Sequence, residues 1–181
     1  MNAAEDAAER AGLSVFAQAC WPEAGVAEPA PLPGFVFSSF SPLVAATAAR
    51  CLAAWYGSAP PSPQEAERVA VILTSVRGDV AIARAIAQSV DGGGRISPLL
   101  FFQSVANAVL GHITSRWGLG GPVLCTSPVG DPAADAMALA ADVLADGDAD
   151  AALIVLAEPA CAPDEQDRAH ALLVRADGAR R

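Results

Sequence analysis

An uninterrupted apolar run from Arg68 to Ser75 constrains the fold more than any other feature of this sequence. The run has the length of a strand and does not alternate between polar and apolar residues. This pattern is typical of a strand that helices cover on both faces, as in the parallel sheets of α/β proteins. We therefore expect a parallel sheet with helices on both of its faces.

Turn signals and apolar segments divide the rest of the chain into further elements. Strands are predicted at 13–20, 122–127, 151–156 and 169–175, and helices at 41–55, 79–90, 99–117 and 131–146. The proline-rich segment 21–34 predicts a surface loop, and Ser41 is expected to cap the helix that it begins. About five strands with helices between them predict an α/β/α sandwich of three layers. We expect a single domain over 1–181, with flexible ends at 1–12 and 177–181.

Two of the predicted helices differ in their polarity. Residues 99–117 are apolar on nearly every side as far as Ser115, which is typical of a helix that is buried all round. The helix at 131–146 carries Asp135, Asp142 and Asp146 along one stripe, and we expect this stripe to face solvent.

The composition predicts apolar surface that is left for a partner. Hydrophobic residues make up 53% of the sequence and charged residues only 17%, which is more apolar than a domain of this size needs for its own core. The apolar runs break before the ~20 residues that span a bilayer, and the acidic N-terminus does not resemble a signal peptide, so we expect no membrane span and a cytoplasmic location. The net charge of −9 excludes a nucleic-acid surface, which needs clustered Lys and Arg.

The cysteines and glycines give no sign of a metal or cofactor site. Cys20, Cys51, Cys125 and Cys161 are widely spaced and form no CxxC pair, so each is interpreted as a small buried hydrophobe. Cys125 is expected to face the packing of its strand, away from any helix N-terminus that would lower the pKa of its thiol. The Gly-rich turn at 91–94 follows a helix and lacks a following Lys-Ser/Thr pair, so it does not predict a nucleotide site.

Gly130 lies at a position of chemical interest, between the strand at 122–127 and a helix that opens with Asp131-Pro132. Many α/β enzymes hold a nucleophile where a strand runs into a helix, because unpaired backbone N–H groups at the helix N-terminus stabilise negative charge. Glycine has no side chain that could attack a substrate. Asp131 is interpreted as the helix cap; as an alternative, its carboxylate would fill the empty position as a negative plug.

The segment before Gly130 resembles the β-ketoacyl synthases, over the part of those enzymes that leads into the active-site elbow. The residues that keep the family's register are Ser97-Pro98, Asn107, Gly111-His112, Gly118-Leu119 and Gly121-Pro122. The resemblance extends over roughly residues 68–176 and implies the N-terminal half of a thiolase-like fold. In the family's spacing the nucleophile position falls on Gly130, so the resemblance implies a synthase relative without its nucleophile.

The same resemblance implies that the chain is no enzyme on its own. A synthase of this family has two similar halves, and the second half supplies two catalytic histidines. This chain of 181 residues has the length of about one domain, and it contains only His112 and His170. Neither histidine lies in a segment that resembles the second half. We interpret both as packed, hydrogen-bonded residues, with His112 on a buried helix.

The resemblance further implies a role as a chain-length factor, the inactive partner of a full-length ketosynthase in type II polyketide systems such as those for aryl polyenes. The start of the helix at 99–117 would project into the partner's acyl tunnel, although it could instead fill this chain's own core. The candidate interface and tunnel residues are Leu99, Leu100, Phe101, Phe102, Asn107 and Leu124. Bulkier residues at Leu100 or Phe102 are expected to shorten the product, and Ala there to lengthen it.

Two other functions remain open, together with the partners. Pairing is expected through the strand at 122–127 and the helix before it, and an acidic acyl carrier protein would bind mainly through the ketosynthase, because this chain is itself acidic. One alternative is a small acyltransferase or thioesterase that uses Cys125 or Asp131. The other is a homodimeric module that binds acyl chains.

Overall fold

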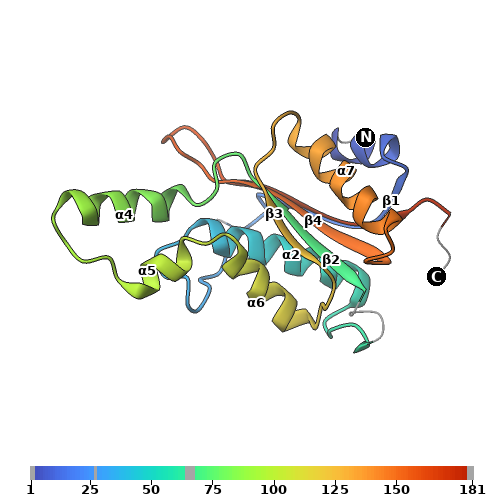
Figure 1. Ribbon diagram of the computed structural model, residues 1–181, viewed down its shortest axis with the longest axis horizontal. Coiled ribbons are helices and arrows are strands. Elements are labelled where there is room, and N and C mark those ends of the chain that lie inside the picture. Colours follow the sequence, from blue (N-terminus) through green and yellow to red (C-terminus); the bar gives the residue numbers. More distant parts are fainter. Residues whose placement is uncertain (1–2, 27, 64–67, 179–181) are drawn as a thin grey trace.

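A computed structural model describes residues 3–26, 28–63 and 68–178 (Figure 1). In chain order the elements are α1 (Ala3–Arg10), β1 (Leu13–Trp21), α2 (Phe40–Tyr56), β2 (Val69–Thr74), α4 (Val80–Asp91), α5 (Pro98–Gln103), α6 (Asn107–Trp117), β3 (Val123–Thr126), α7 (Pro132–Ala145), β4 (Ala151–Glu158) and β5 (Arg168–Ala176).

The five strands form one sheet in the order β1-β5-β4-β2-β3. β2 is buried along its whole length and pairs in parallel with β3 and β4, so the expected parallel sheet is confirmed for these three strands. The expectation is wrong for β5, which runs antiparallel to both β4 and β1. The loop at 159–167 returns the chain directly from β4 to β5, and antiparallel neighbours need no crossover helix.

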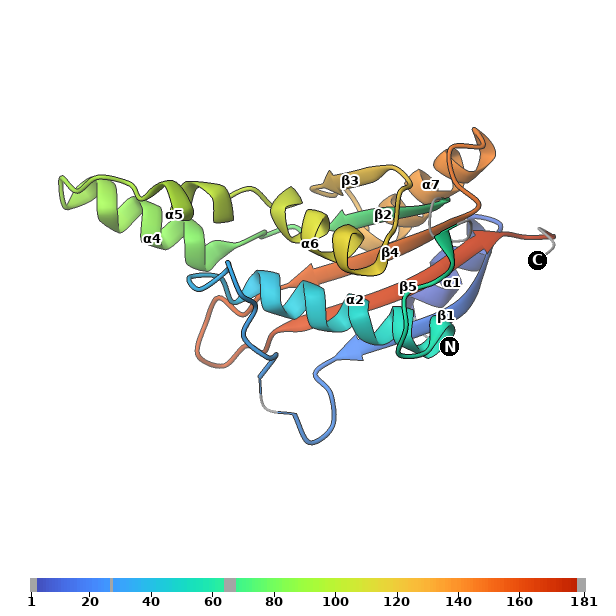
Figure 2. The same cartoon turned by 90° about the horizontal axis from the view of Figure 1, so that it is seen from below.

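Helices cover both faces of this sheet, which confirms the predicted sandwich of three layers. α2 and α6 lie on one face, and α1 and α7 lie on the other (Figure 2). Each face of the sheet has its own hydrophobic core, and alternate residues of β2 point into one or the other. Val71 and Leu73 pack towards α2 and α6, whereas Ala70 and Ile72 pack towards α7. β3 is an edge strand, and α7 begins beyond its carboxyl end.

The N-terminal segment is ordered where the sequence predicts a flexible end. Residues 3–10 form α1, and Ala4, Ala7 and Ala8 are buried in the core that α1 shares with α7. Small side chains allow the two helices to approach closely, which a hydrophobicity pattern dominated by Ala and Glu does not reveal. At the C-terminal end, residues 177 and 178 form a turn, and the rest of the predicted flexible end lies outside the described residues.

The single buried helix predicted at 99–117 is wrong, because α5 and α6 are separate helices with a break at 104–106. α6 packs on α2, but α4 and α5 extend beyond the end of the sheet as a pair (Figure 1). We call residues 80–104 the arm. The cap of α2 also differs from the prediction: Ser41 does not cap, and its backbone N–H instead donates to Ser38 Oγ at 2.8 Å.

Candidate functional site

The loop at 127–131 joins β3 to α7 and forms the elbow at the carboxyl edge of the parallel strands. Asp131 has extended backbone and its carboxylate accepts a hydrogen bond from the Ala134 N–H at 2.8 Å. Pro132 follows at the first helical position, where its missing N–H costs nothing. Asp131 is therefore the helix cap, and the alternative in which its carboxylate plugs the elbow is not what the structure places there.

A different carboxylate occupies the elbow. Asp135 Oδ2 accepts hydrogen bonds from the backbone N–H of Val129 at 2.9 Å and from that of Gly130 at 3.0 Å. The sequence pattern predicts only that Asp135 shares a solvated stripe with Asp142 and Asp146. Its position in the first turn of α7 was the available signal, since a side chain there can reach back to the N–H groups before the helix.

The backbone at Gly130 does not require glycine. Its φ lies outside the left-handed region, and a Cβ built on it would come no closer than 3.6 Å to Asp135 Oδ1, an ordinary van der Waals contact. A side chain with a nucleophile could therefore stand at this position. The backbone geometry therefore does not impose glycine at position 130.

The cysteines are less buried than predicted. Cys51 is buried as expected, and burial raises the pKa of its thiol to about 12. Cys20 and Cys125 are exposed and Cys161 is half-buried, so the prediction is wrong for these three. Cys125 is accessible because β3 lies at the edge of the sheet. Partial desolvation nevertheless raises the pKa of the Cys125 thiol, which disfavours a thiolate nucleophile at neutral pH.

Both histidines are half-buried and contact neighbouring side chains. His112 is half-buried on α6, and its ring packs edge-on against Phe35 at a centroid distance of 6.4 Å. His170 is half-buried on β5, with Nε2 2.9 Å from Gln18 Oε1, and desolvation lowers the pKa of its imidazole. His170 thus has the hydrogen-bond partner that is expected from the sequence, whereas His112 shows a ring contact and is only half-buried.

A groove of about 340 Å³ opens at the carboxyl ends of β2 and β4. Its lining includes Thr74, Leu156 and His170 from the sheet and Pro132 from the start of α7. Sequence reasoning missed this groove because separate strands contribute its walls. Its surface is mostly apolar, and Thr74 Oγ1 lies 3.0 Å from Thr126 Oγ1, within hydrogen-bond distance.

The candidate interface and tunnel residues differ in their exposure to solvent. On α5 of the arm, Leu99, Phe101 and Phe102 are exposed by 43%, 67% and 52%, whereas Leu100 is buried. This exposure excludes the alternative in which the first residues of the predicted helix all fill the chain's own core. Asn107 is exposed at the start of α6, and Leu124 on β3 is half-buried on the side that packs towards α7.

A neighbouring loop adds to the apolar surface of α5, and sequence reasoning missed it. Val36 and Phe37 are exposed beside the arm, and the Phe35 ring lies 6.2 Å from the Phe102 ring. The buried Gln103 side chain holds the two segments together, because its Oε1 accepts from the Phe37 N–H at 3.1 Å. We call Val36, Phe37, Leu99, Phe101 and Phe102 the apolar patch.

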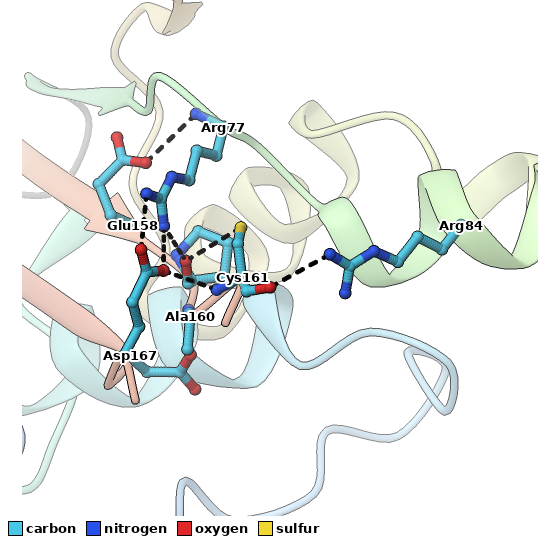
Figure 3. A network of polar contacts seen from close by, with 8 residues as sticks. Arg77, Arg84, Glu158, Ala160, Cys161 and Asp167 are labelled. Carbon is cyan, nitrogen blue, oxygen red and sulfur yellow. Dashed lines mark hydrogen bonds and ion pairs between the residues drawn. The ribbon is translucent and has the colours of Figure 1, made fainter. Parts of the chain in front are cut away.

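A polar network fixes the base of the arm to the loop at 159–167 (Figure 3). The Glu158 carboxylate accepts from the backbone N–H groups of Val76 and Arg77. The Arg77 guanidinium pairs with both oxygens of Glu165 and holds the pKa of that carboxyl at about 2, well below its usual value. Arg84 on α4 donates to the Cys161 carbonyl at 3.3 Å. The arm therefore has a defined direction where it leaves the sheet.

The solved structures that are similar to this fold include ketosynthases and their complexes. A chain of the ketosynthase (ApeO) in complex with its chain length factor (ApeC) from Xenorhabdus doucetiae has a TM-score of 0.66 and 18% identity, covering 91% of this chain and 79% of that one. The ishigamide ketosynthase/chain length factor gives 0.67 and 17%, covering 88% and 50%. A β-ketoacyl synthase from Burkholderia phymatum gives 0.67 and 17%, covering 94% and 54%. The chain thus spans about half the length of the last two, and at these identities the likeness shows the fold.

Comparison with curated protein sequences finds no match. Among the described residues, no helix is both long and apolar enough to cross a membrane. The family model for the β-ketoacyl synthase N-terminal domain matches residues 37–172, which include the sheet from β2 to most of β5, the elbow and the arm. The chain belongs to the β-ketoacyl synthase N-terminal domain family.

Proposed function

We propose that this protein is a non-catalytic chain-length factor, which pairs with an active ketosynthase and shapes its acyl tunnel in type II polyketide or polyene biosynthesis. The observation that carries the proposal is the elbow, where Gly130 offers no nucleophile and Asp135 takes the backbone N–H groups beside it. A chain with such an elbow would contribute to a ketosynthase reaction by shaping the acyl tunnel and not by chemistry.

The comparisons support this proposal because similar folds occur in structures of ketosynthases with chain length factors. Two of the solved structures above are complexes or pairs of a ketosynthase and a chain length factor. A fourth similar structure contains a type II polyketide acyl carrier protein in complex with its ketosynthase, with a TM-score of 0.59 and 15% identity. We infer that a carrier protein reaches the complex through the ketosynthase, since this chain carries a net charge of −9 and carrier proteins are usually acidic.

The edge of the sheet at β3 is the proposed pairing surface. Within the part of the chain that the structure describes, β3 pairs with β2 alone, and Val123 and Cys125 are exposed on it. An exposed edge strand offers backbone N–H and C=O groups to a strand of another chain. Continuation of the sheet into a ketosynthase, with α6 beside it, would bury more than about 2,000 Å², as obligate pairs commonly do.

The exposed side chains of α5 are the proposed tunnel residues. Phe101 and Phe102 project from the arm, which reaches beyond the sheet in the direction that the polar network at its base fixes (Figure 2). Large apolar side chains that enter a partner's tunnel would close it and limit the length of the acyl chain. Leu100 points into this chain and serves to hold α5 in place.

Co-expression with the ketosynthase of the same gene cluster tests the pairing. We expect one peak of the complex in size-exclusion chromatography, loss of that peak for C125K, and no change for A53K, which adds the same charge to an exposed position of α2. Two separate peaks for the unmodified proteins would contradict the proposal. A homodimer that binds fatty acyl ligands without a ketosynthase would instead favour the acyl-binding module.

A direct assay separates the proposal from the catalytic alternative. The Cys125 thiol is accessible but its pKa is raised, so we expect no acyl group to move from a labelled carrier thioester onto the isolated chain. Transfer that disappears in C125A would show that the chain is an acyltransferase.

A further inference from the structure

The Asp135 carboxylate accepts hydrogen bonds from two backbone N–H groups of the elbow. Its Oδ2 atom lies 2.9 Å from the Val129 nitrogen and 3.0 Å from the Gly130 nitrogen. One oxygen thus accepts two hydrogen bonds from consecutive backbone groups. Asp131 already caps α7 through the Ala134 N–H, so Asp135 is not needed for that purpose.

Acyl transfer needs such N–H groups for a different oxygen. When a nucleophile attacks a thioester, the electron pair of the C=O bond moves onto the oxygen, and preorganised N–H donors stabilise the charge that develops there. A resident carboxylate consumes these donors and places a negative charge where the new one would form. Each effect opposes the reaction separately from the missing nucleophile.

We propose that Asp135 closes the elbow to acyl chemistry independently of Gly130, because its carboxylate holds the Val129 and Gly130 N–H groups. The chain therefore carries two separate blocks to catalysis. Restoring a nucleophile at position 130 removes only one of them. This inference extends the proposed non-catalytic role, but it concerns the elbow alone and does not depend on any partner.

The experiment places a thiol at the elbow and reads its ionisation. A Cβ at position 130 lies 3.6 Å from Asp135 Oδ1, so the thiol introduced by G130C reports on that carboxylate. We would compare G130C, G130C/D135N and G130C/D142N, and measure alkylation by iodoacetamide against pH. Fragment-ion mass spectrometry separates the introduced thiol from Cys125. Asp142 is the matched control, since it lies on the same helix, is exposed and carries the same charge.

We expect D135N to lower the pH midpoint of alkylation by about one unit relative to G130C, because it removes a like charge beside the thiolate. D142N should move the midpoint by much less, and added salt should reduce the difference at this exposed site. Equal midpoints for G130C and G130C/D135N, or an equal shift with D142N, would overturn the proposal.

Two features keep this result interpretable. Asparagine retains an oxygen that can accept both N–H bonds, so D135N isolates the effect of the charge. G130C/D135A also frees the two N–H groups and should lower the midpoint further, because those donors can then stabilise the thiolate. Melting curves check that both variants fold. The thiol is read in this chain whether it is purified alone or with a ketosynthase. A negative thiol titration would therefore contradict only the role of Asp135, whereas a failure to co-elute would contradict the pairing with a ketosynthase.

Discussion

Gly121 and Gly130 lie on either side of β3, and they differ in whether the structure could accept a side chain at their position. A Cβ at Gly121 would lie 2.4 Å from the Val69 carbonyl oxygen, so close backbone packing between the start of β3 and β2 excludes any side chain. A Cβ at Gly130 meets only an ordinary contact. The glycine in the Gly121-Pro122 motif is thus structural, whereas the one in the elbow leaves room for other residues.

This difference predicts opposite outcomes for the same substitution. G130A should change the free energy of unfolding by less than about 0.5 kcal/mol, because no contact or backbone strain opposes it. G121A should cost more than about 2 kcal/mol, since backbone atoms must move apart to admit the methyl group. Urea unfolding followed by circular dichroism measures both. A large loss of stability in G130A would show that the elbow itself needs glycine.

The sequence predicted half of this site. The strand, the helix start and the Asp-Pro pair are local signals that place Gly130 between a strand and a helix and predict the cap at Asp131, whereas the nucleophile position on Gly130 follows from the spacing of the family that the chain resembles. The bonds from Asp135 depend on how far the loop at 127–131 turns back over the first turn of α7, and no local pattern encodes that. The exposure of Cys125 was missed for a related reason, because only the strand order shows that β3 is an edge.

Among the elements, α1 has the least expected role. Its buried face consists of Ala4, Ala7 and Ala8, and it packs on the alanine-rich surface of α7. A helix that contributes only methyl groups gains stability from close approach and not from large apolar area. A charged side chain on this face has no space and no partner.

We therefore predict that A7D destabilises the protein by about 3 kcal/mol, because it buries an uncompensated carboxylate between α1 and α7. A3D is the matched control. Ala3 is exposed at the start of α1, where a carboxylate interacts favourably with the helix dipole, so its effect should stay within about 0.5 kcal/mol. Thermal and urea unfolding measure both variants. Equal stability of A7D and A3D would mean that α1 does not pack on α7 in solution.

The ion pair between Arg77 and Glu165, which we call the clasp, makes the attachment of the arm depend on pH. The Glu165 pKa is about 2 in the folded chain, below its ordinary value of 4.5, chiefly because Arg77 donates to the carboxylate. A depressed pKa stabilises the folded state above the ordinary value, and this contribution is lost as the pH falls towards about 2. E165Q should accordingly lose less stability than the unmodified protein between about pH 5 and pH 2.

Hydrogen exchange gives a local readout of the same contact. Glu165 also accepts from the Cys161 N–H at 2.8 Å, so E165Q should speed exchange in the loop at 159–167 at neutral pH. D164N removes the same charge from the neighbouring position, where the structure shows no side-chain bond, and should leave exchange unchanged. Similar exchange rates in both variants would rule out the clasp.

The elements differ in how well the sequence predicted them. The buried strand at 68–75 was clear because uniform apolarity has one common cause in a strand of that length. The uniform apolarity of 99–117 had two causes that look alike in a sequence: α6 is packed inside the protein, while α5 exposes much of its apolar surface on the arm. The antiparallel pairing of β5 also depends on the path of the 159–167 loop and not on the strand's own residues.

At the scale of the whole molecule, the surplus of apolar residues is concentrated and not spread evenly. The apolar patch of Val36, Phe37, Leu99, Phe101 and Phe102 joins the arm to the loop beside it. Such side chains lose contact with water when a partner covers them, which favours association. The patch and the edge of β3 belong to different parts of the molecule, so a partner that covers both would have to extend from the sheet to the arm.

The proposed tunnel role makes its sharpest prediction at Phe102. In a reconstituted complex, F102A should shift the products towards longer chains and F102W towards shorter ones, because the side chain sets the space at the end of the tunnel. V90A alters an equally exposed apolar residue on α4 and should leave product length unchanged. Leu100, which the sequence also suggested, is buried, so L100W would overpack α5 at a cost of ~1–3 kcal/mol before it could affect a tunnel. Mass spectrometry of the released chains decides the question, and unchanged product lengths in both Phe102 variants, with the complex intact, would remove Phe102 from the tunnel.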